Sequence, residues 1–268
     1  MKHRRIPGAR LKDLSSTKLI PNILTLLGLC AGITAVRFAL HGQWEAAVAA
    51  IGVAGLLDVL DGGMARLLSA GSEFGAELDS LADLVSFGVA PALVLYLWSM
   101  QDAATLGWAL ALLFCVCCAL RLARFNTGLD ADDAPPWAER YFTGVPAPAG
   151  AGLVLMPMVL SFEFPDAAFG HVALNAVVIV AVSVLMVGRA PTYSLKGIRV
   201  PSKLVVPVMV LVGLLAGFVV GAPWLTAAAI GLLYILSLPA SYISYRRLVR
   251  AAEKAEADQM APADKSPD

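Results

Sequence analysis

Two pairs of aspartates lie inside stretches of sequence that are otherwise apolar. Asp58 and Asp61 are three residues apart, and Asp79 and Asp83 are four residues apart. In an α-helix, either spacing places both side chains of a pair on the same face. A carboxylate in a membrane-spanning helix is energetically costly and normally faces a cavity, a partner or an ion. Four such acids close together therefore predict a bound cation.

The depth of the four acids also favours a shared site. If the two segments form neighbouring antiparallel helices joined by a short turn, a rise of about 1.5 Å per residue places Asp61 and Asp79 about 6 to 8 Å from that turn. Asp58 and Asp83 then lie about 12 Å from it. Carboxylate oxygens in two such layers, open on the side of the turn, suit hard divalent cations such as Mg²⁺ or Mn²⁺.

Small residues and one arginine surround the acids. Gly62 and Ala65 follow the first pair, and Gly75 precedes the second. Their lack of bulk allows helices or a ligand to approach closely. Arg66 lies near the turn, where a guanidinium could bind a phosphate. The pattern as a whole indicates a polar pocket for a phosphorylated substrate with bound metal.

The elements that must position these residues are membrane helices. Of the 268 residues, 59% are hydrophobic and only 15% are charged, which is too apolar for an ordinary soluble domain. The predicted fold class is therefore an all-α polytopic membrane protein, with apolar runs long enough to cross about 30 Å of hydrocarbon. We expect eight transmembrane helices, near residues 20–41, 44–66, 75–98, 104–125, 144–162, 170–188, 204–220 and 223–244.

Basic residues set the expected orientation and the division of the chain. Lys and Arg gather in alternate connections between the apolar runs, and the remaining connections contain none. The positive-inside rule then places both termini and the acids on the cytoplasmic side of a bacterial-type inner membrane. We expect three segments: a cytoplasmic or interfacial segment at 1–19, a transmembrane catalytic domain at 20–249 and a disordered cytoplasmic tail at 250–268.

The acids and their neighbours resemble a known signature. The pattern Asp58-x2-Asp61-Gly62-x2-Ala65-Arg66-x8-Gly75-x3-Asp79-x3-Asp83 resembles that of the CDP-alcohol phosphotransferase family at every fixed position. Eight specified residues at specified offsets make a chance match very improbable in a membrane sequence poor in aspartate. The resemblance implies a helical bundle that transfers a phosphate-linked lipid group to an alcohol and releases CMP.

The same resemblance implies a role for each residue of the signature. Asp58, Asp61 and Asp79 would bind a two-metal centre, and Asp83 would bind metal and act as the catalytic base. The two divalent ions would screen the negative charge around the phosphorus and stabilise the leaving phosphate. The CDP site would be shaped by Gly62, Ala65, Arg66 and Gly75.

Other segments resemble one branch of this family. "IPNILTLLGLCAGITAVRFAL" at 20–40, "ALRLARFN" at 119–126 and "PTYSLKGIRVP" at 191–201 resemble bacterial CDP-diacylglycerol–serine O-phosphatidyltransferases. The expected substrates are therefore CDP-diacylglycerol and L-serine. The resemblance also implies contact with membrane lipids and a homodimer, and we expect no nucleic-acid partner.

The residues that would bind serine are less specific. Arg121 and Arg124 share a helix face at the cytoplasmic end of the fourth apolar run, where a cation could hold the serine carboxylate. Ser86, one turn beyond Asp83, could lie beside the acceptor. The arginines could instead satisfy only the positive-inside rule or bind lipid head groups, and Ser86 could bond its own backbone.

Two further basic residues and two other functions complete the predictions. Lys196 and Arg199, in a cytoplasmic loop, would contact the phosphates or the head group of the CDP-lipid, and the alternatives are contact with the serine carboxylate or a role in topology alone. The nearest alternative function changes the acceptor to glycerol 3-phosphate or inositol phosphate, which should require more cations around the pocket. The second alternative function is an ion-coupled transporter, which should have acidic side chains along a full transmembrane path. Here the acids stop about halfway.

Overall fold

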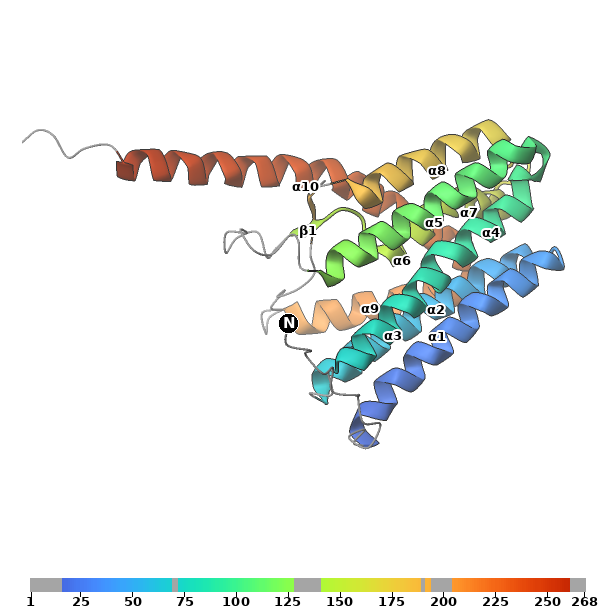
Figure 1. Ribbon diagram of the computed structural model, residues 1–268, viewed down its shortest axis with the longest axis horizontal. Coiled ribbons are helices and arrows are strands. Elements are labelled where there is room, and N and C mark those ends of the chain that lie inside the picture. Colours follow the sequence, from blue (N-terminus) through green and yellow to red (C-terminus); the bar gives the residue numbers. More distant parts are fainter. Residues whose placement is uncertain (1–15, 69–71, 128–140, 189–190, 194–203, 261–268) are drawn as a thin grey trace, which may run out of the picture.

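The helices of this protein run alongside one another in an elongated bundle (Figure 1). The computed structural model describes residues 16–68, 72–127, 141–188, 191–193 and 204–260. Each of the eight predicted apolar runs is helical over most of its length, which confirms the all-α polytopic fold class.

The first half of the chain forms four long helical segments. The first two pack side by side along their length and join through a tight turn at Gly42. The third is one continuous helix that includes two short π-helical stretches, and the fourth follows a single 3₁₀ turn. The bounds are α1 (Ser16–Leu40), α2 (Trp44–Leu67), α3 (Glu73–Asp83), η2 (Leu84–Val89), α4 (Ala90–Leu95), η3 (Tyr96–Met100), η4 (Gln101–Ala103) and α5 (Ala104–Asn126).

The second half of the chain adds shorter helices and one small pair of strands. The predicted fifth run is split into two helices at Leu155. The strands pair antiparallel, with Tyr141 opposite Tyr193, and the sequence analysis did not anticipate them. The bounds are β1 (Tyr141–Thr143), α6 (Ala147–Val154), α7 (Met156–Glu163), α8 (Val172–Val187), β2 (Pro191–Tyr193), α9 (Val205–Gly221) and α10 (Pro223–Met260).

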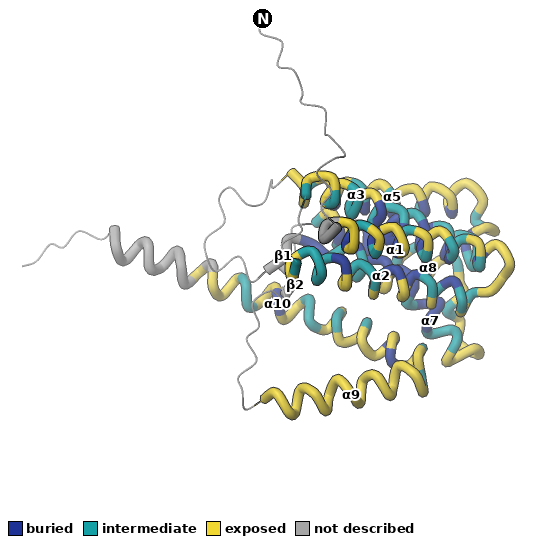
Figure 2. The backbone as a smooth tube through the Cα atoms, turned by 90° about the horizontal axis from the view of Figure 1, so that it is seen from below, coloured by how far each residue is buried: buried dark blue, intermediate teal, exposed yellow. Residues whose placement is uncertain are grey.

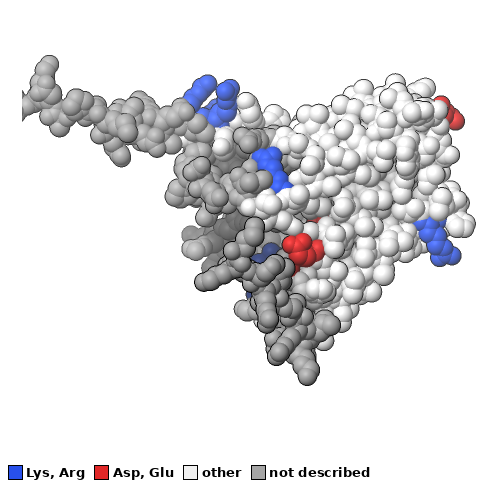
Figure 3. Space-filling view, viewed as in Figure 1, with Lys and Arg blue, Asp and Glu red and all other residues white. Residues whose placement is uncertain are grey.

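The distribution of apolar and charged side chains is that of a multi-pass membrane protein. Exposed apolar residues cover the sides of the bundle, and α9 is exposed along its whole length (Figure 2). On the face in Figure 3, charged side chains lie toward the ends of the bundle. In the part of the chain that the structure describes, four stretches are long and apolar enough to cross a membrane, namely Leu19–Leu40, Trp44–Leu67, Glu73–Asn126 and Pro223–Leu248. The helices Val172–Val187 and Val205–Gly221 are apolar but shorter.

Helix α10 extends further than expected. It continues to Met260, so residues 250–260 are helical although we expected a disordered tail to begin at 250. Its 38 residues span about 57 Å at about 1.5 Å per residue, nearly twice the hydrocarbon thickness of about 30 Å. The C-terminal part therefore projects beyond the bundle (Figure 1), and Pro239 lies inside the helix. The rest of the tail, 261–268, and residues 1–15 of the expected interfacial segment lie outside the described residues.

The core lies where the third helical segment meets its neighbours. Phe87, Leu95, Phe114, Met158 and Ile179 are among the largest side chains that are fully buried. They come from η2, α4, α5, α7 and α8, so most of the bundle contributes to one continuous apolar core. This core holds η2, and with it the end of α3, in a fixed position against α1.

The contact between α1 and η2 leaves no room for a side chain. A Cβ atom added to Gly32 would lie 2.8 Å from the Cα atom of Ser86, which is closer than carbon atoms approach in folded proteins. One turn earlier on α1, the carbonyl of Gly28 accepts a hydrogen bond from the Ser86 hydroxyl at 3.3 Å. Gly32 thus permits the backbone approach that places η2 against α1.

We expect Gly32→Ala to destabilise the fold, because the added methyl group must push α1 away from η2. Overpacking of this kind costs about 1 to 3 kcal/mol, so the midpoint of thermal unfolding in detergent should fall. Gly217→Ala on α9 is the matched control, since it brings the same gain in helix propensity and no atom lies within 4 Å of the new methyl group. Equal midpoints for the two variants would contradict the prediction.

Candidate functional site

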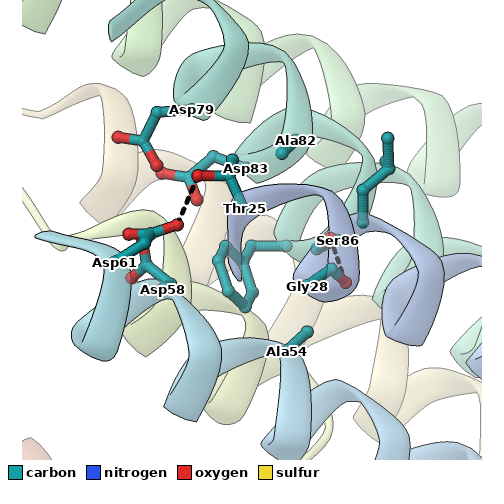
Figure 4. Close-up of a pocket in the computed structure, with 11 residues that line it drawn as sticks. Thr25, Gly28, Ala54, Asp58, Asp61, Asp79, Ala82, Asp83 and Ser86 are labelled. Carbon is teal, nitrogen blue, oxygen red and sulfur yellow. Dashed lines mark hydrogen bonds between the residues drawn. The ribbon is translucent and has the colours of Figure 1, made fainter. Parts of the chain in front are cut away.

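The two pairs of aspartates meet between α2 and α3 (Figure 4). One carboxylate oxygen from each of Asp58, Asp61 and Asp79 can be chosen so that all three lie within 4.8 Å of one another. Asp83 lines the same pocket. The expected geometry, in which the two pairs share one site, is therefore present.

Helix α1 completes the site with a residue that the sequence analysis did not assign. The hydroxyl of Thr25 lies 2.6 Å from Oδ2 of Asp61 and 3.1 Å from the carbonyl oxygen of Pro21. Both Thr25 and Asp61 are buried, so this hydrogen bond fixes the orientation of the Asp61 carboxylate. A threonine one turn after Pro21 in an apolar run was the available signal, but many membrane helices bond such a residue only to their own backbone.

The start and end of α3 place its two aspartates. Ser72 is extended and accepts a hydrogen bond from the backbone N–H of Gly75 at 3.0 Å, which caps the first turn of the helix. Asp83 is the last α-helical residue, and the π-helical turn η2 begins at the next residue. The wider π turn changes the register of the following side chains, and such turns are frequent at functional sites.

A second cavity, of about 170 Å³, adjoins the acids. It shares Thr25, Asp61 and Asp79 with the pocket of the acids, and three residues predicted for the CDP site line it, namely Gly62, Ala65 and Gly75. Asn22 of α1 also lines this cavity, and sequence analysis did not assign it. A Cβ atom on Gly62 would lie 3.9 Å from Nη1 of Arg66, so the predicted phosphate-binding guanidinium is beside the cavity.

The structure separates the two arginines that the sequence had grouped. Nη1 of Arg124 donates a hydrogen bond to the carbonyl oxygen of Val187 at 3.1 Å, which satisfies the last residue of α8. Arg121 is half-buried and lies within electrostatic range of Asp83. Its Nε atom is buried and has no hydrogen-bond partner among the described residues.

The remaining predicted residues are placed differently. Ser86 is buried and its hydroxyl donates to the carbonyl of Gly28, so it takes part in the contact between α1 and η2 (Figure 4). Lys196 and Arg199 lie outside the described residues. Of the predicted serine-binding residues, Arg121 alone thus combines a position near Asp83 with a buried donor that lacks an acceptor among the described residues.

The donor set of the acids fits a hard divalent cation. Oxygen atoms bound to Mg²⁺ lie about 2.1 Å from the ion, and those bound to Ca²⁺ about 2.3 to 2.6 Å. Two oxygens bound to one ion are therefore at most roughly 4 to 5 Å apart. The chosen oxygens of the three carboxylates lie within 4.8 Å of one another, so they are close enough to bind the same ion. All the ligand atoms are carboxylate oxygens, which magnesium and manganese prefer. Asp58, Asp61 and Asp79 could thus bind a metal ion.

Comparison with known proteins gives the same family as the signature around the four aspartates. Residues 18–188 match the family CDP-alcohol phosphatidyltransferase, and residues 203–239 match CDP-alcohol phosphatidyltransferase 2. A CDP-diacylglycerol–serine O-phosphatidyltransferase from Mycobacterium bovis is 39% identical over 236 residues, which cover 88% of this chain and 82% of that protein.

Proteins of the same name from two further organisms are also similar. The one from Helicobacter pylori is 34% identical over 73% of this chain and 81% of its own length. The one from Bacillus subtilis is 37% identical over 54% of this chain and 76% of its own length. The family match includes all four aspartates, and the chain belongs to the CDP-alcohol phosphotransferase family.

Proposed function

We propose that this protein transfers the phosphatidyl group of CDP-diacylglycerol to the hydroxyl of L-serine, which forms phosphatidylserine and releases CMP. The observation that carries the proposal is the convergence of Asp58, Asp61, Asp79 and Asp83 on one pocket beside a second cavity. The names of the relatives support serine as the acceptor.

The acids would divide the chemistry between them. Asp58, Asp61 and Asp79, with Asp83, would hold two divalent cations, for which Mg²⁺ and Mn²⁺ are the best candidates. When bound, such ions screen the charge of the diphosphate and of the departing CMP. Asp83 accepts the proton of the serine hydroxyl while the serine oxygen bonds to the phosphorus that carries diacylglycerol. The bond from that phosphorus to the CMP oxygen breaks.

The cavity beside the acids would bind the cytidine diphosphate. Gly62, Ala65 and Gly75 would leave space for it, and Arg66, whose guanidinium lies near Gly62, would bind a phosphate. Asn22 can donate or accept hydrogen bonds at the same cavity, so we add it to the predicted CDP-binding residues.

Two observations weigh against the alternative functions. An acceptor that carries a phosphate needs several cations, whereas Arg124 is bonded to the end of α8 and Arg121 remains as the cation near Asp83 among the described residues. A transport path needs polar groups across the whole membrane, but the outer halves of α2 and of the third helical segment are apolar. The first observation favours a zwitterionic acceptor such as serine, and the second favours an enzyme over a transporter.

We further propose that the site faces the cytoplasm of a bacterial-type inner membrane, with both termini on that side. The distribution of Lys and Arg supports this orientation, and serine and CMP are both soluble there. The family resemblance also supports a homodimer, which light scattering of the purified protein would test.

The proposed reaction is tested by an acceptor screen. Purified protein, CDP-diacylglycerol and Mn²⁺ or Mg²⁺ should release CMP with serine, and much more slowly with glycerol 3-phosphate, inositol phosphate or water. Removal of the metal with a chelator should abolish the release. In sealed vesicles, added serine should be used only when the cytoplasmic face is outward. Rapid CMP release with a phosphorylated acceptor, and none with serine, would overturn serine as the acceptor.

We expect Asp83→Asn to reduce turnover by roughly a hundredfold or more, because an amide cannot accept the proton of the serine hydroxyl. Binding of CDP-diacylglycerol should be largely retained. Asp61→Asn should lower both the turnover and the affinity for metal. Glu77→Gln, an exposed change on α3, the helix of Asp83, should alter neither the turnover nor the metal affinity. Normal turnover of the Asp83 variant across a range of metal concentrations would exclude it as the base.

We expect Arg121→Lys to raise the KM for serine by about tenfold, which corresponds to about 1.4 kcal/mol. Lysine keeps the charge but loses the two parallel hydrogen bonds that a guanidinium makes to a carboxylate. Arg124→Lys should leave this KM nearly unchanged, and Arg66→Lys should instead weaken binding of CDP-diacylglycerol. If neither Arg121→Lys nor Arg124→Lys affects the serine dependence, the carboxylate is bound elsewhere, with Lys196 and Arg199 the next candidates.

A further inference from the structure

Four buried hydrogen-bond donors lack a partner among the described residues, and two of them lie within electrostatic range of each other. These two are Nε of Arg121, on α5, and the hydroxyl of Tyr234, on α10. Buried donors are nearly always bonded, and each exception in a native structure requires an explanation. The other buried polar atoms without a partner belong to neutral side chains, those of Asn175, Ser183 and Ser241. Arg121 is therefore the cation among the side chains whose buried polar atoms lack a partner in the described residues, and Tyr234 lies near it.

These two donors lie near each other and near the reacting groups. Arg121 is within electrostatic range of Tyr234 and of Asp83. Phe87 connects the two regions, because it lines both the pocket of the acids and the cavity of about 390 Å³ that Tyr234 lines. A small anion bound between Arg121 and Tyr234 would thus lie close to the proposed base.

Among the described residues, no neighbouring group satisfies the Tyr234 hydroxyl. Thr192 of β2 lies beside it, but no hydrogen bond of acceptable geometry joins the two side chains. The Thr192 hydroxyl instead donates to the carbonyl oxygen of Gly144 at 3.0 Å, which ties β2 to the segment before α6. The contact of β2 with α10 therefore positions Tyr234 but leaves its proton available to a ligand.

We propose that Tyr234 is a serine-recognition residue, whose hydroxyl donates a hydrogen bond to the carboxylate that Arg121 binds. The inference rests on the proposed function, and it adds α10 to the elements that choose the acceptor. A carboxylate has two oxygens and about four lone-pair positions, so it can accept from a guanidinium and a phenol together. Held in this way, serine has its carboxylate at Arg121 and Tyr234 and its hydroxyl free to point toward Asp83.

Such an arrangement would make the carboxylate a requirement for the acceptor. The two buried donors lose their charged acceptor if the alcohol substrate has no carboxylate, and sites built around a substrate's hydrogen bonds discriminate against analogues that lack the bonding group. Serinamide keeps the hydroxyl and the ammonium group of serine but replaces the carboxylate with a neutral amide. The preference for serine over serinamide therefore measures the contribution of this site.

The test is Tyr234→Phe in the full-length protein, assayed by CMP release with serine and with serinamide. The KM for serine should rise by roughly tenfold, because one hydrogen bond to a charged group is lost. The preference for serine over serinamide should fall by a similar factor, and the KM for CDP-diacylglycerol should stay within about twofold of the wild-type value. Tyr242→Phe, on the same helix and exposed, is the matched control and should change none of these values.

The outcomes separate this inference from the function on which it rests. A wild-type protein that uses serine, with a Tyr234→Phe variant of unchanged serine KM, would overturn the role of Tyr234 alone. A variant whose CDP-diacylglycerol KM rises instead would assign Tyr234 to the lipid and also overturn it. A loss of kcat and thermal stability with the serine preference intact would indicate a merely structural role. A wild-type protein that does not use serine would overturn both proposals.

Discussion

The cost of holding carboxylates inside an apolar bundle governs the architecture around them. Like charges at a few ångströms repel strongly where water is scarce, so four acids can share a pocket only if the protein orients them and a cation or bound protons compensate their charge. Three helices meet this need together. Helices α2 and α3 supply the acids, and α1 supplies the Thr25 hydroxyl that orients Asp61. The close approach of α1 to η2 at Gly32 keeps α1 in place beside the acids.

Arg121 and Arg124 illustrate how helix position separates residues of the same type. Both lie near the end of α5, yet Arg124 reaches the last carbonyl of α8 and Arg121 is directed to the interior near Asp83. The first interaction stabilises a helix end, where backbone carbonyls lack partners of their own. The second leaves a cation available for an anionic ligand. The sequence alone could not distinguish these roles, because the partner carbonyl comes from a helix more than 60 residues away.

Much of the fold and of the acid site could be predicted from local patterns. The apolar runs have the length of the bilayer, and the spacing of each aspartate pair follows from the period of the helix, so both predictions needed no knowledge of tertiary contacts. The signature then related the two pairs to each other. The tail was less predictable, because the polar, Ala-rich sequence of 250–260 has good helix formers that extend α10 from an existing helix without a new nucleation step.

What sequence analysis missed depends on contacts between distant segments. Thr25 matters because α1 packs against α2, and nothing in its own neighbourhood of sequence indicates a partner 36 residues away. The π-helical turn after Asp83 and the pairing of β1 with β2 also arise from packing, since neither segment has a local pattern specific to that structure. Tyr234 was absent from the predictions because α10 lies outside the signature.

Pro239 has a mechanical consequence for α10. Proline has no backbone N–H, so the hydrogen bond that would join position 239 to the carbonyl of Ile235 is missing, and a helix bends most easily at such a point. Tyr234 lies on the side of this joint that packs against the bundle, and the projecting part of α10 lies on the other. Forces that act on the projecting part of α10 therefore bend the helix at Pro239. The part of α10 that carries Tyr234 is thereby isolated from forces at the C-terminal end.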